Sequence, residues 1–432
     1  MKRVLHLAAT TTGKMALQSL AISLTSRIGQ LAMTVLAARM LAPEGFGVFT
    51  FALGVGLVGG RLFGLGWPIL MNRFVPKYRL AEDWPLLRGL VRAAGGVTLL
   101  AGLTGGLLCA ALALVLGPES TLHTGLLLGG LLLPVMAFRS LFRNLLAALR
   151  TPQRGIVVDE LLPAGLMTLM LLAFLGGQID AEDATLLYVL ASLVAVGAGG
   201  WWVLHRLPPQ TGRAAPRYTL GRWMRTALPA LVGSSARLLM NRTDILMIAP
   251  LATMAAVGHY GAAMRITYLQ AAPVIVLSTV ITARLSEAFA AGQVDRGKRL
   301  FFGSLAFAAA WTLPCALAFV VFDGEIMRLV FGAAYVEAAP ILSVLAIAQV
   351  GAALNIPATS LMLMTGRQAA FGKMTLAALL LNIGGNLALI PPYGGLGAAI
   401  ATAVSIIALT LMQLTSCAVI LRSGRYAERD GQ

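Results

Sequence analysis

The sequence predicts an all-α polytopic membrane protein with about 12 transmembrane helices in two six-helix bundles, related by a pseudo-two-fold axis along the membrane normal. Composition, the placement of basic residues and a weak repeat between the halves predict this fold. The 432 residues are 58% hydrophobic and 12% charged, whereas soluble domains carry roughly 25% charged residues. A mean hydropathy of +0.83 excludes a water-soluble enzyme, a disordered tail protein and a secreted disulfide scaffold.

Apolar segments long enough to cross a bilayer occur along the whole chain. A hydrocarbon layer of ~30 Å requires about 20 apolar helical residues. Two of the segments are long enough to be tilted or broken, the second and the tenth. We expect spans at residues 17–38, 46–71, 93–116, 122–145, 156–177, 184–205, 226–249, 256–282, 301–322, 338–364, 370–391 and 395–421.

Most of the 33 Lys and Arg that give the net charge of +16 fall in alternate loops between these spans. Acids such as Glu119, Asp183 and Asp323 occupy the other loops. By the positive-inside rule, both termini are therefore expected in the cytoplasm. The surplus charge reflects topology and attraction to anionic phospholipid rather than to nucleic acid.

The turn between the fourth and fifth spans holds several charges that we assign to the cytoplasmic side. Arg139 and Arg143 are counted with the basic residues of this turn. Asp159 and Glu160 are interpreted as the first residues of the fifth span, where the helix dipole stabilises negative charge.

The longest polar joint lies near the middle of the chain and divides it into three parts. These are an N-terminal lobe (1–207), a basic cytoplasmic linker (208–225) and a C-terminal lobe (226–432). At a constant offset, EGFGVFTFA in the first half aligns with AAVGHYGAA in the second. Because each half has an even number of spans, the repeat is parallel, and such repeats place a substrate cavity between the lobes.

Five arginines are predicted inside spans, where each costs roughly 2.5–3.5 kcal/mol on insertion scales. Polar residues recur at helical spacing on the first span and again on the seventh, which predicts matching polar faces. We expect these faces to line a cationic, water-accessible vestibule. Its predicted substrate-binding residues are Arg27, Arg61, Arg237, Arg265, Gln30 and Asn241, with Asp244 as an ion-coupling or ion-pair residue.

A structural interpretation also fits several of these residues. Arg237, Asn241 and Asp244 also fit an internally satisfied ion-pair cluster. The fifth arginine, Arg242, points roughly 140° away from Arg237 and suits snorkelling as well as binding. The glycines around Arg61 fit either close helix packing or a hinge.

No constellation in the sequence predicts catalysis. The four His are scattered, no phosphate-binding Gly-rich loop occurs, and Cys109, Cys315 and Cys417 lie in apolar runs without metal-ligand spacing. We therefore expect neither an enzyme nor a metal or other cofactor. A cationic cavity without catalytic groups favours a transporter of something anionic.

Several segments resemble the polysaccharide transporter branch of the multidrug/oligosaccharidyl-lipid/polysaccharide flippase superfamily, which includes O-antigen flippases. They are distributed over nearly the whole chain and depend on glycine. The segments are LAARMLAPEGFGVFTFALG after the polar first span, RTDILMIAPL followed by VGHYGAAMRI, FGAAYVEAAPILSVLA, LMTGRQ and PPYGGLGAAIATAVS.

The resemblance implies translocation of an undecaprenyl-pyrophosphate-linked oligosaccharide, an O-antigen or exopolysaccharide unit, across the bacterial inner membrane by alternating access. Arg27, Arg61 and Arg265 occupy positions similar to the cavity arginines of such flippases, and Asp244 falls on an acidic family position. The implied partners are the lipid-linked oligosaccharide, a coupling ion (H⁺ or Na⁺) and other polysaccharide assembly proteins. The two additional helices of lipid II flippases are missing, which ranks a peptidoglycan precursor lower.

Three other functions stay open. A multidrug antiporter of the same superfamily is expected to favour carboxylates in its cavity, whereas here arginines outnumber Asp244. A membrane glycosyltransferase or ligase acting on the same lipid carrier needs a catalytic acid or a large outer loop, and neither is found. The third is a non-transporting scaffold in cell-wall assembly.

Overall fold

The computed structural model describes residues 11–174, 179–227, 231 and 242–423, and their regular structure is entirely helical. The chain forms two compact units, unit 1 (Met1–Arg242) and unit 2 (Thr243–Gln432). The predicted all-α class is confirmed over the described residues. The exact count of twelve spans and their relation by a pseudo-two-fold axis stay predictions.

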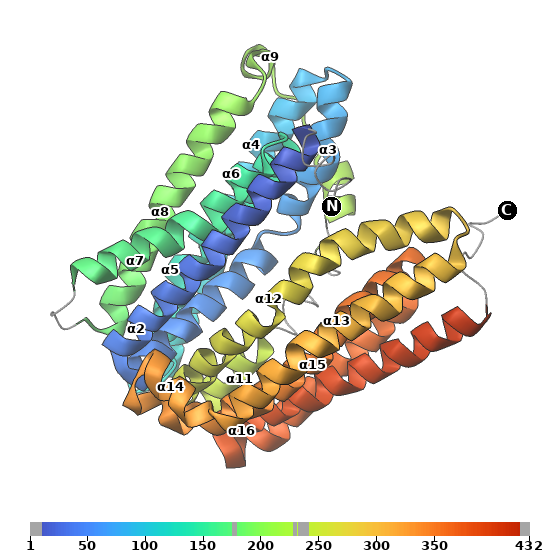
Figure 1. Cartoon of the computed structure of the whole chain (residues 1–432). Helices are drawn as coiled ribbons and strands as arrows, with labels where there is room; N and C mark the ends of the chain where they lie inside the picture. Colours follow the sequence, from blue (N-terminus) through green and yellow to red (C-terminus); the bar gives the residue numbers. More distant parts are fainter. Residues whose placement is uncertain (1–10, 175–178, 228–230, 232–241, 424–432) are drawn as a thin grey trace. The chain divides into compact units, whose positions relative to one another are not determined.

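Unit 1 is organised around α5 (His123–Ala148), which packs against α2, α3, α4 and α8 (Figure 1). α2 is broken at Ala42, whose φ of 54° lies outside the helical region directly before Pro43. The other elements are α2 (Thr11–Phe63), α3 (Trp67–Leu80), α4 (Trp84–Leu116), α6 (Pro152–Ile156), η1 (Val157–Leu161), α7 (Leu162–Ala173), α8 (Ala181–Arg206) and α9 (Pro209–Arg213).

Sequence signals explain where the predicted second span ends. Residues 46–71 are not one helix, because the chain turns between α2 and α3. Gly66 adopts a φ of 74°, which glycine tolerates without strain. Pro68 then occupies the first turn of α3, where a missing N–H costs no helical hydrogen bond. The predicted option of a broken span is therefore confirmed here.

The linker segment after α9 packs on the α3–α4 end of unit 1. The backbone N–H of Arg217 donates to Pro85 O (3.0 Å), and its guanidinium contacts Asp83 Oδ2 (2.7 Å). Trp223 is fully buried, donates its indole N–H to the Tyr78 hydroxyl (3.0 Å) and meets Trp67 edge to face. Residues from the predicted linker thus contribute to the core of this unit.

α6, η1 and α7 form one continuous helical rod with a π-helical turn at η1. Pro163 follows this turn and has no N–H to donate to the carbonyl of Asp159 four residues earlier. The carbonyl of Asp159 is instead an acceptor for the Arg139 guanidinium. A local backbone irregularity therefore supplies a polar atom to the neighbouring helix α5.

Unit 2 is organised around α15 (Ala339–Met364), which packs against α12, α13 and α16. α16 (Gln368–Ser423) bends at Gly394, which has a φ of 55° and follows Pro391 and Pro392. This bend falls between the last two predicted spans. The other elements are α11 (Thr243–Leu251), α12 (Met254–Ala290), α13 (Val294–Val321), α14 (Asp323–Phe331) and η2 (Ala333–Ala338).

The exposed surfaces of the long helices are apolar along their middle stretches. Leu100, Leu107 and Leu114 of α4 each expose two thirds or more of their surface, as expected of side chains that face lipid. In the described part of the chain, eight helical segments are long and apolar enough to cross a membrane. One of them, the 55-residue segment Gln368–Arg422, is long enough for two crossings.

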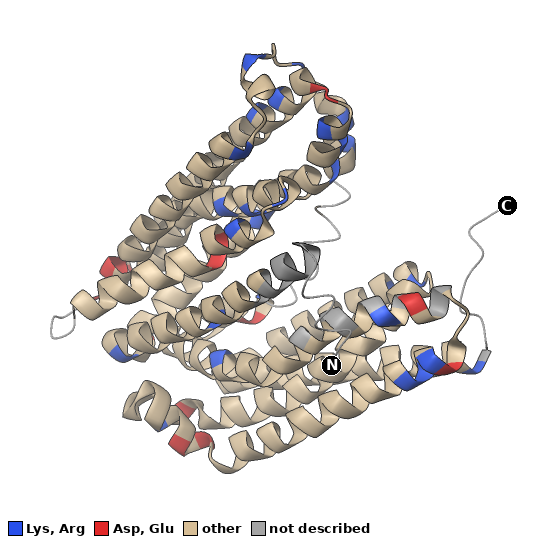
Figure 2. Cartoon of the chain, turned by 45° about the horizontal axis from the view of Figure 1, so that its top comes forward, with Lys and Arg blue, Asp and Glu red and all other residues tan. Residues whose placement is uncertain are grey.

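Charged residues gather near helix ends in each unit (Figure 2). In unit 2, Arg284, Arg296 and Lys298 flank the α12–α13 turn, whereas Asp323 and Glu325 begin α14 at the other end of α13. This separation of charge agrees with alternate loops of opposite sign. The cytoplasmic orientation itself stays a prediction.

Substitution of Gly89 in α4 tests whether the linker packs against this helix. An added Cβ at Gly89 would lie 1.9 Å from Arg217 O, whereas nothing lies within 4 Å of a Cβ at Gly96 on the same helix. We expect Gly89→Ala to lower the free energy of unfolding by about 1–3 kcal/mol through overpacking. Gly96→Ala should leave it unchanged or raise it by up to about 1 kcal/mol. Thermal unfolding of both variants in detergent checks this, and equal stability would contradict the docking of the linker.

Candidate functional site

Unit 1 contains a partly open polar cavity of about 320 Å³. At ~30 Å³ per water molecule, this is room for roughly ten waters. Three arginines line it, from two helices, together with one carboxylate. Its lining residues are Leu57 and Arg61 of α2, Met136, Arg139, Ser140, Arg143 and Asn144 of α5, Asp159 of η1 and Tyr188 of α8.

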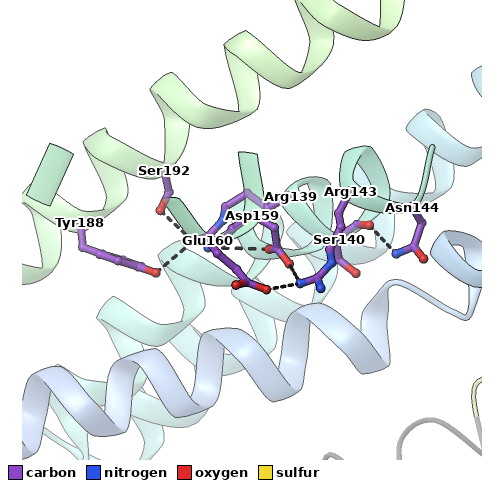
Figure 3. A network of polar contacts seen from close by, with 8 residues as sticks. All are labelled: Arg139, Ser140, Arg143, Asn144, Asp159, Glu160, Tyr188 and Ser192. Atoms are coloured by element: carbon purple, nitrogen blue, oxygen red, sulfur yellow. Dashed lines mark hydrogen bonds and ion pairs between the residues drawn. The ribbon is translucent and has the colours of Figure 1, made fainter. Parts of the chain in front are cut away.

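Arg139 is a buried arginine of α5 with contacts on two other elements (Figure 3). Its Nη1 donates to the Tyr188 hydroxyl (3.0 Å) and to Ser192 Oγ (3.1 Å), both on α8. Its Nη2 donates to the carbonyl of Asp159, whose carboxylate lies 3.7 Å away. These contacts fasten α5 to η1 and α8, so Arg139 fixes the wall of the cavity.

Arg143, one helical turn later, is held by two acids through a single nitrogen. Its Nη1 lies 2.7 Å from Asp159 Oδ2 and 2.8 Å from Glu160 Oε1. The side chain is 42% exposed, in contrast to Arg139. Figure 3 shows both carboxylates meeting the same end of the guanidinium.

The structure corrects where these charges lie in the helices: the arginines are within α5 rather than in the turn, and the acids are not the first residues of the next helix. Arg139 lies nine residues before the last residue of α5, about 13 Å at 1.5 Å per residue. Asp159 and Glu160 belong to the π turn η1, five residues into the rod that begins at α6, and they pair with arginines. The sequence analysis missed this site because it assigned arginines near a loop to that loop. The four-residue spacing of Arg139 and Arg143, which places both on one helix face, was the signal that could have found it.

Arg61 is half-buried and lines the same cavity from α2. Within the described residues no acid lies within ion-pair distance of it. The glycines before it let α2 approach α5 closely, since an added Cβ at Gly56 would lie 2.8 Å from Leu132 Cβ and one at Gly60 3.2 Å from Leu133 O. Close packing, one of the two alternatives for this glycine run, therefore applies to these two positions.

The polar face predicted on the first span is only partly available. Arg27 is exposed and Gln30 is half-buried. Ser26 and Thr34 are buried, and their hydroxyls donate to the carbonyls of Ile22 and Gln30 on the same helix. Arg27 and Gln30 are thus the members of this face that an incoming molecule can reach.

Unit 2 surrounds the carboxylate of Asp244 with neutral donors. Asp244 is 4% exposed. Tyr260 and Thr402 donate to its Oδ2 at 2.5 and 2.8 Å, and the side-chain amides of Asn382 and Asn386 donate to its Oδ1 at 3.2 and 2.9 Å. Four hydrogen bonds to a carboxylate compensate much of its burial.

The Asp244 cluster has the oxygen chemistry that hard cations prefer. It offers a carboxylate, two amide groups and two hydroxyls. The buried Oδ1 of Asn386 has no hydrogen-bond partner within the described residues. Carboxylate and carbonyl-type oxygens are ligands for hard cations. In the described residues no group of three or more His, Cys, Asp or Glu could hold a metal.

The sequence pointed to Asp244 but not to its partners. Asn382 and Asn386 are four residues apart within an apolar span, and polar residues at that spacing inside a membrane indicate a site. The partners lie 138 and 142 residues from Asp244, so only the folded chain identifies them. Arg237 and Asn241 lie outside the described residues, so the ion-pair alternative that included them stays a prediction.

Arg265 and Arg242 are the remaining predicted intramembrane arginines. Arg265 is half-buried on α12, and Arg242 is half-buried directly before α11. The vestibule lined by helices of both halves stays a prediction, because unit 1 and unit 2 are each described by themselves.

Known proteins share this arrangement of helices. Residues 165–340 match a family model described as "Polysaccharide biosynthesis protein". The lipid II flippase MurJ in an inward closed conformation superposes with a TM-score of 0.74 at 15% identity, over 92% of this chain and 87% of that one. An inward-facing multidrug resistance MATE family transporter of the MOP superfamily gives 0.66 at 14% identity, over 94% and 95%. The chain has the MOP-superfamily fold.

A further structure extends this similarity over nearly the whole length. A MOP superfamily transporter from Pyrococcus furiosus, described by a binding pocket of reverse polarity, gives a TM-score of 0.61 at 14% identity over 98% of both chains. No curated protein shows significant sequence similarity. The fold expected for this superfamily is confirmed, and the two solved structures with the higher TM-scores are named as a flippase and a transporter.

Arg139 tests whether the network supports the fold of unit 1. Arg139→Gln removes the contacts to Asp159 and shortens the reach to α8, and breaking a buried ion pair costs about 3 kcal/mol or more. We expect a clear drop in the thermal unfolding temperature in detergent. Arg150→Gln, an exposed position two residues beyond α5, should change stability by less than about 0.5 kcal/mol. Equal stability of the two variants would show that the network is not structural.

Proposed function

We propose that this chain is a flippase that moves a polyprenyl-pyrophosphate-linked oligosaccharide across a bacterial inner membrane by alternating access. The observation that carries the proposal is the cavity of about 320 Å³ whose wall includes Arg61, Arg139 and Arg143. Three arginines against one lining carboxylate favour an anion. A transporter of cationic drugs would place carboxylates there instead.

The chemistry of the cargo explains why arginine is suited to this wall. A pyrophosphate with about two negative charges is strongly disfavoured in hydrocarbon, whereas guanidinium groups bind phosphate oxygens bidentately. The family match to polysaccharide biosynthesis proteins over residues 165–340 supports a saccharide cargo. The structural similarity to a lipid II flippase supports a lipid carrier. An O-antigen or exopolysaccharide unit is the cargo we propose.

Asp244 is the residue we propose for ion coupling, with H⁺ or Na⁺ as the ion. Its carboxylate is buried and lies among side chains that can exchange donor for acceptor roles. Asn382 and Asn386 would present oxygen rather than nitrogen to a cation after rotation of their amides. The unpartnered Oδ1 of Asn386 among the described residues supports this role.

Arg61 of the cavity and Arg27 of the polar face on the first span can be tested in cells. We expect Arg27→Ala combined with Arg61→Ala to abolish surface glycan while the protein remains inserted and folded. The lipid-linked precursor should then accumulate at the cytoplasmic face, where extraction and mass spectrometry identify its sugars. Arg73→Ala, an exposed arginine on α3, is the matched control and should export normally. Normal surface glycan in the double variant would contradict the proposal.

Ion coupling can be tested in proteoliposomes that contain the purified protein and the lipid-linked precursor. We expect Asp244→Asn to abolish the acceleration of transport by a Na⁺ or H⁺ gradient, because the cation loses the charged ligand of the cluster. Asp323→Asn is the control, since Asp323 also accepts hydrogen bonds, from Gly324 N and Ser343 Oγ, but lies at the start of α14. An unchanged gradient response in Asp244→Asn would remove Asp244 from coupling.

A further inference from the structure

We propose that Arg143 binds the phosphate of the cargo beside Arg61, and that Asp159 and Glu160 orient Arg143 and limit how tightly it holds that phosphate. This inference rests on the proposed function, since it concerns the same anionic cargo. It adds Arg143 as an anion-binding residue, which the sequence analysis counted with a turn, and Asp159 and Glu160 as its counter-charges, which were interpreted there as the first residues of a span.

The hydrogen bonds of Arg143 leave one edge of its guanidinium available. Both acids contact Nη1, at 2.7 and 2.8 Å, so its two hydrogens are used. The N–H groups on Nε and Nη2 have no partner within the described part of the chain. That edge is the one that forms side-on, bidentate contacts with phosphate or carboxylate groups, and Arg143 lines the cavity.

The other two arginines of the cavity differ in whether protein side chains already occupy their guanidinium groups. Arg61, across the cavity on α2, has no acidic partner among the described residues. Arg139 is committed to Tyr188, Ser192 and Asp159. Its buried Nε has no hydrogen-bond partner among the described residues. Because buried polar groups are normally hydrogen-bonded, this N–H indicates that a further hydrogen-bond acceptor binds at the cavity wall. Arg61 and Arg143 are therefore the two side chains placed to bind an anion directly.

The two acids set the charge of the site. Three arginines alone would present three positive charges to the cargo, whereas Asp159 and Glu160 reduce the net charge of the group to +1. A site that transports must bind strongly enough to capture its cargo and weakly enough to release it. Built-in carboxylates meet both needs, because they fix the direction of Arg143 while lowering the attraction for phosphate.

Substitution of Glu160 tests the lowering of anion affinity separately from the orientation of Arg143. Glu160 contacts Arg143 but does not line the cavity, so its substitution leaves the wall intact. Glu160→Gln keeps an oxygen that accepts a hydrogen bond from Nη1 and removes one negative charge. At a few ångströms that charge is worth roughly a tenfold change in anion affinity. A purely structural Glu160 would not raise affinity when it is neutralised.

The test measures binding of inorganic pyrophosphate to the purified full-length protein by isothermal titration calorimetry. We expect Glu160→Gln to bind roughly tenfold more tightly and yet to export less glycan in cells, because release slows. Glu182→Gln, an exposed acid on α8, should behave as wild type. Arg143→Gln should weaken binding roughly tenfold or more, and Arg143→Lys should weaken it nearly as much, because lysine lacks the bidentate edge.

The outcomes distinguish failure of this inference about Arg143 from failure of the proposed flippase function. If Arg61→Gln weakens binding while the Arg143 variants bind as wild type, this inference is wrong and the proposed function stands. If Glu160→Gln binds pyrophosphate no more tightly than wild type, the counter-charge role is wrong. If neither wild type nor Glu160→Gln binds pyrophosphate, the anion cavity itself is wrong, and the proposed function loses the observation that carries it.

Discussion

An ionised side chain within a hydrocarbon layer must be neutralised, fully hydrogen-bonded or in contact with water, because its transfer from water is otherwise too costly. Each unit meets this constraint differently. Unit 1 shares two acids of η1 between two arginines of α5 and opens a cavity beside them. Unit 2 surrounds one carboxylate with four neutral donors. In both units these partners come from different helices, so satisfying the charges also holds those helices together.

The π turn η1 helps unit 1 to provide hydrogen-bond partners for its buried arginines. The carbonyl of Asp159 lacks its α-helical donor because Pro163 has no N–H. That carbonyl and the carboxylate of the same residue then serve different arginine nitrogens, on Arg139 and Arg143. A single residue in the π turn thus connects the structural arginine to the one that faces the cavity, which a regular α-helix at this point would not do.

Much of the fold follows from hydropathy and from proline and glycine positions, since spans, breaks and bends depend on local sequence. Pro43 and Gly394 mark two places in the described part of the chain where a long helix breaks. The sites were predicted less completely. Arg61 and Asp244 stand out because a charge within an apolar run is visible in sequence. Arg139 was missed because a rule that assigns arginines near loops to the cytoplasm cannot detect a buried partner on another helix.

The Asp244 cluster joins several helices, so the cation proposed to bind there would act on more than one helix. Asn382 and Asn386 precede the bend of α16 at Gly394, whereas Thr402 follows it, and Asn382 donates to Thr402 across the bend at 3.1 Å. Asp244 itself comes from α11, and Tyr260 from α12. A ligand shifts a conformational equilibrium only if it interacts differently with the two states. Because a cation would replace hydrogen bonds that join both arms of α16 to α11 and α12, its binding energy depends directly on the packing of these helices.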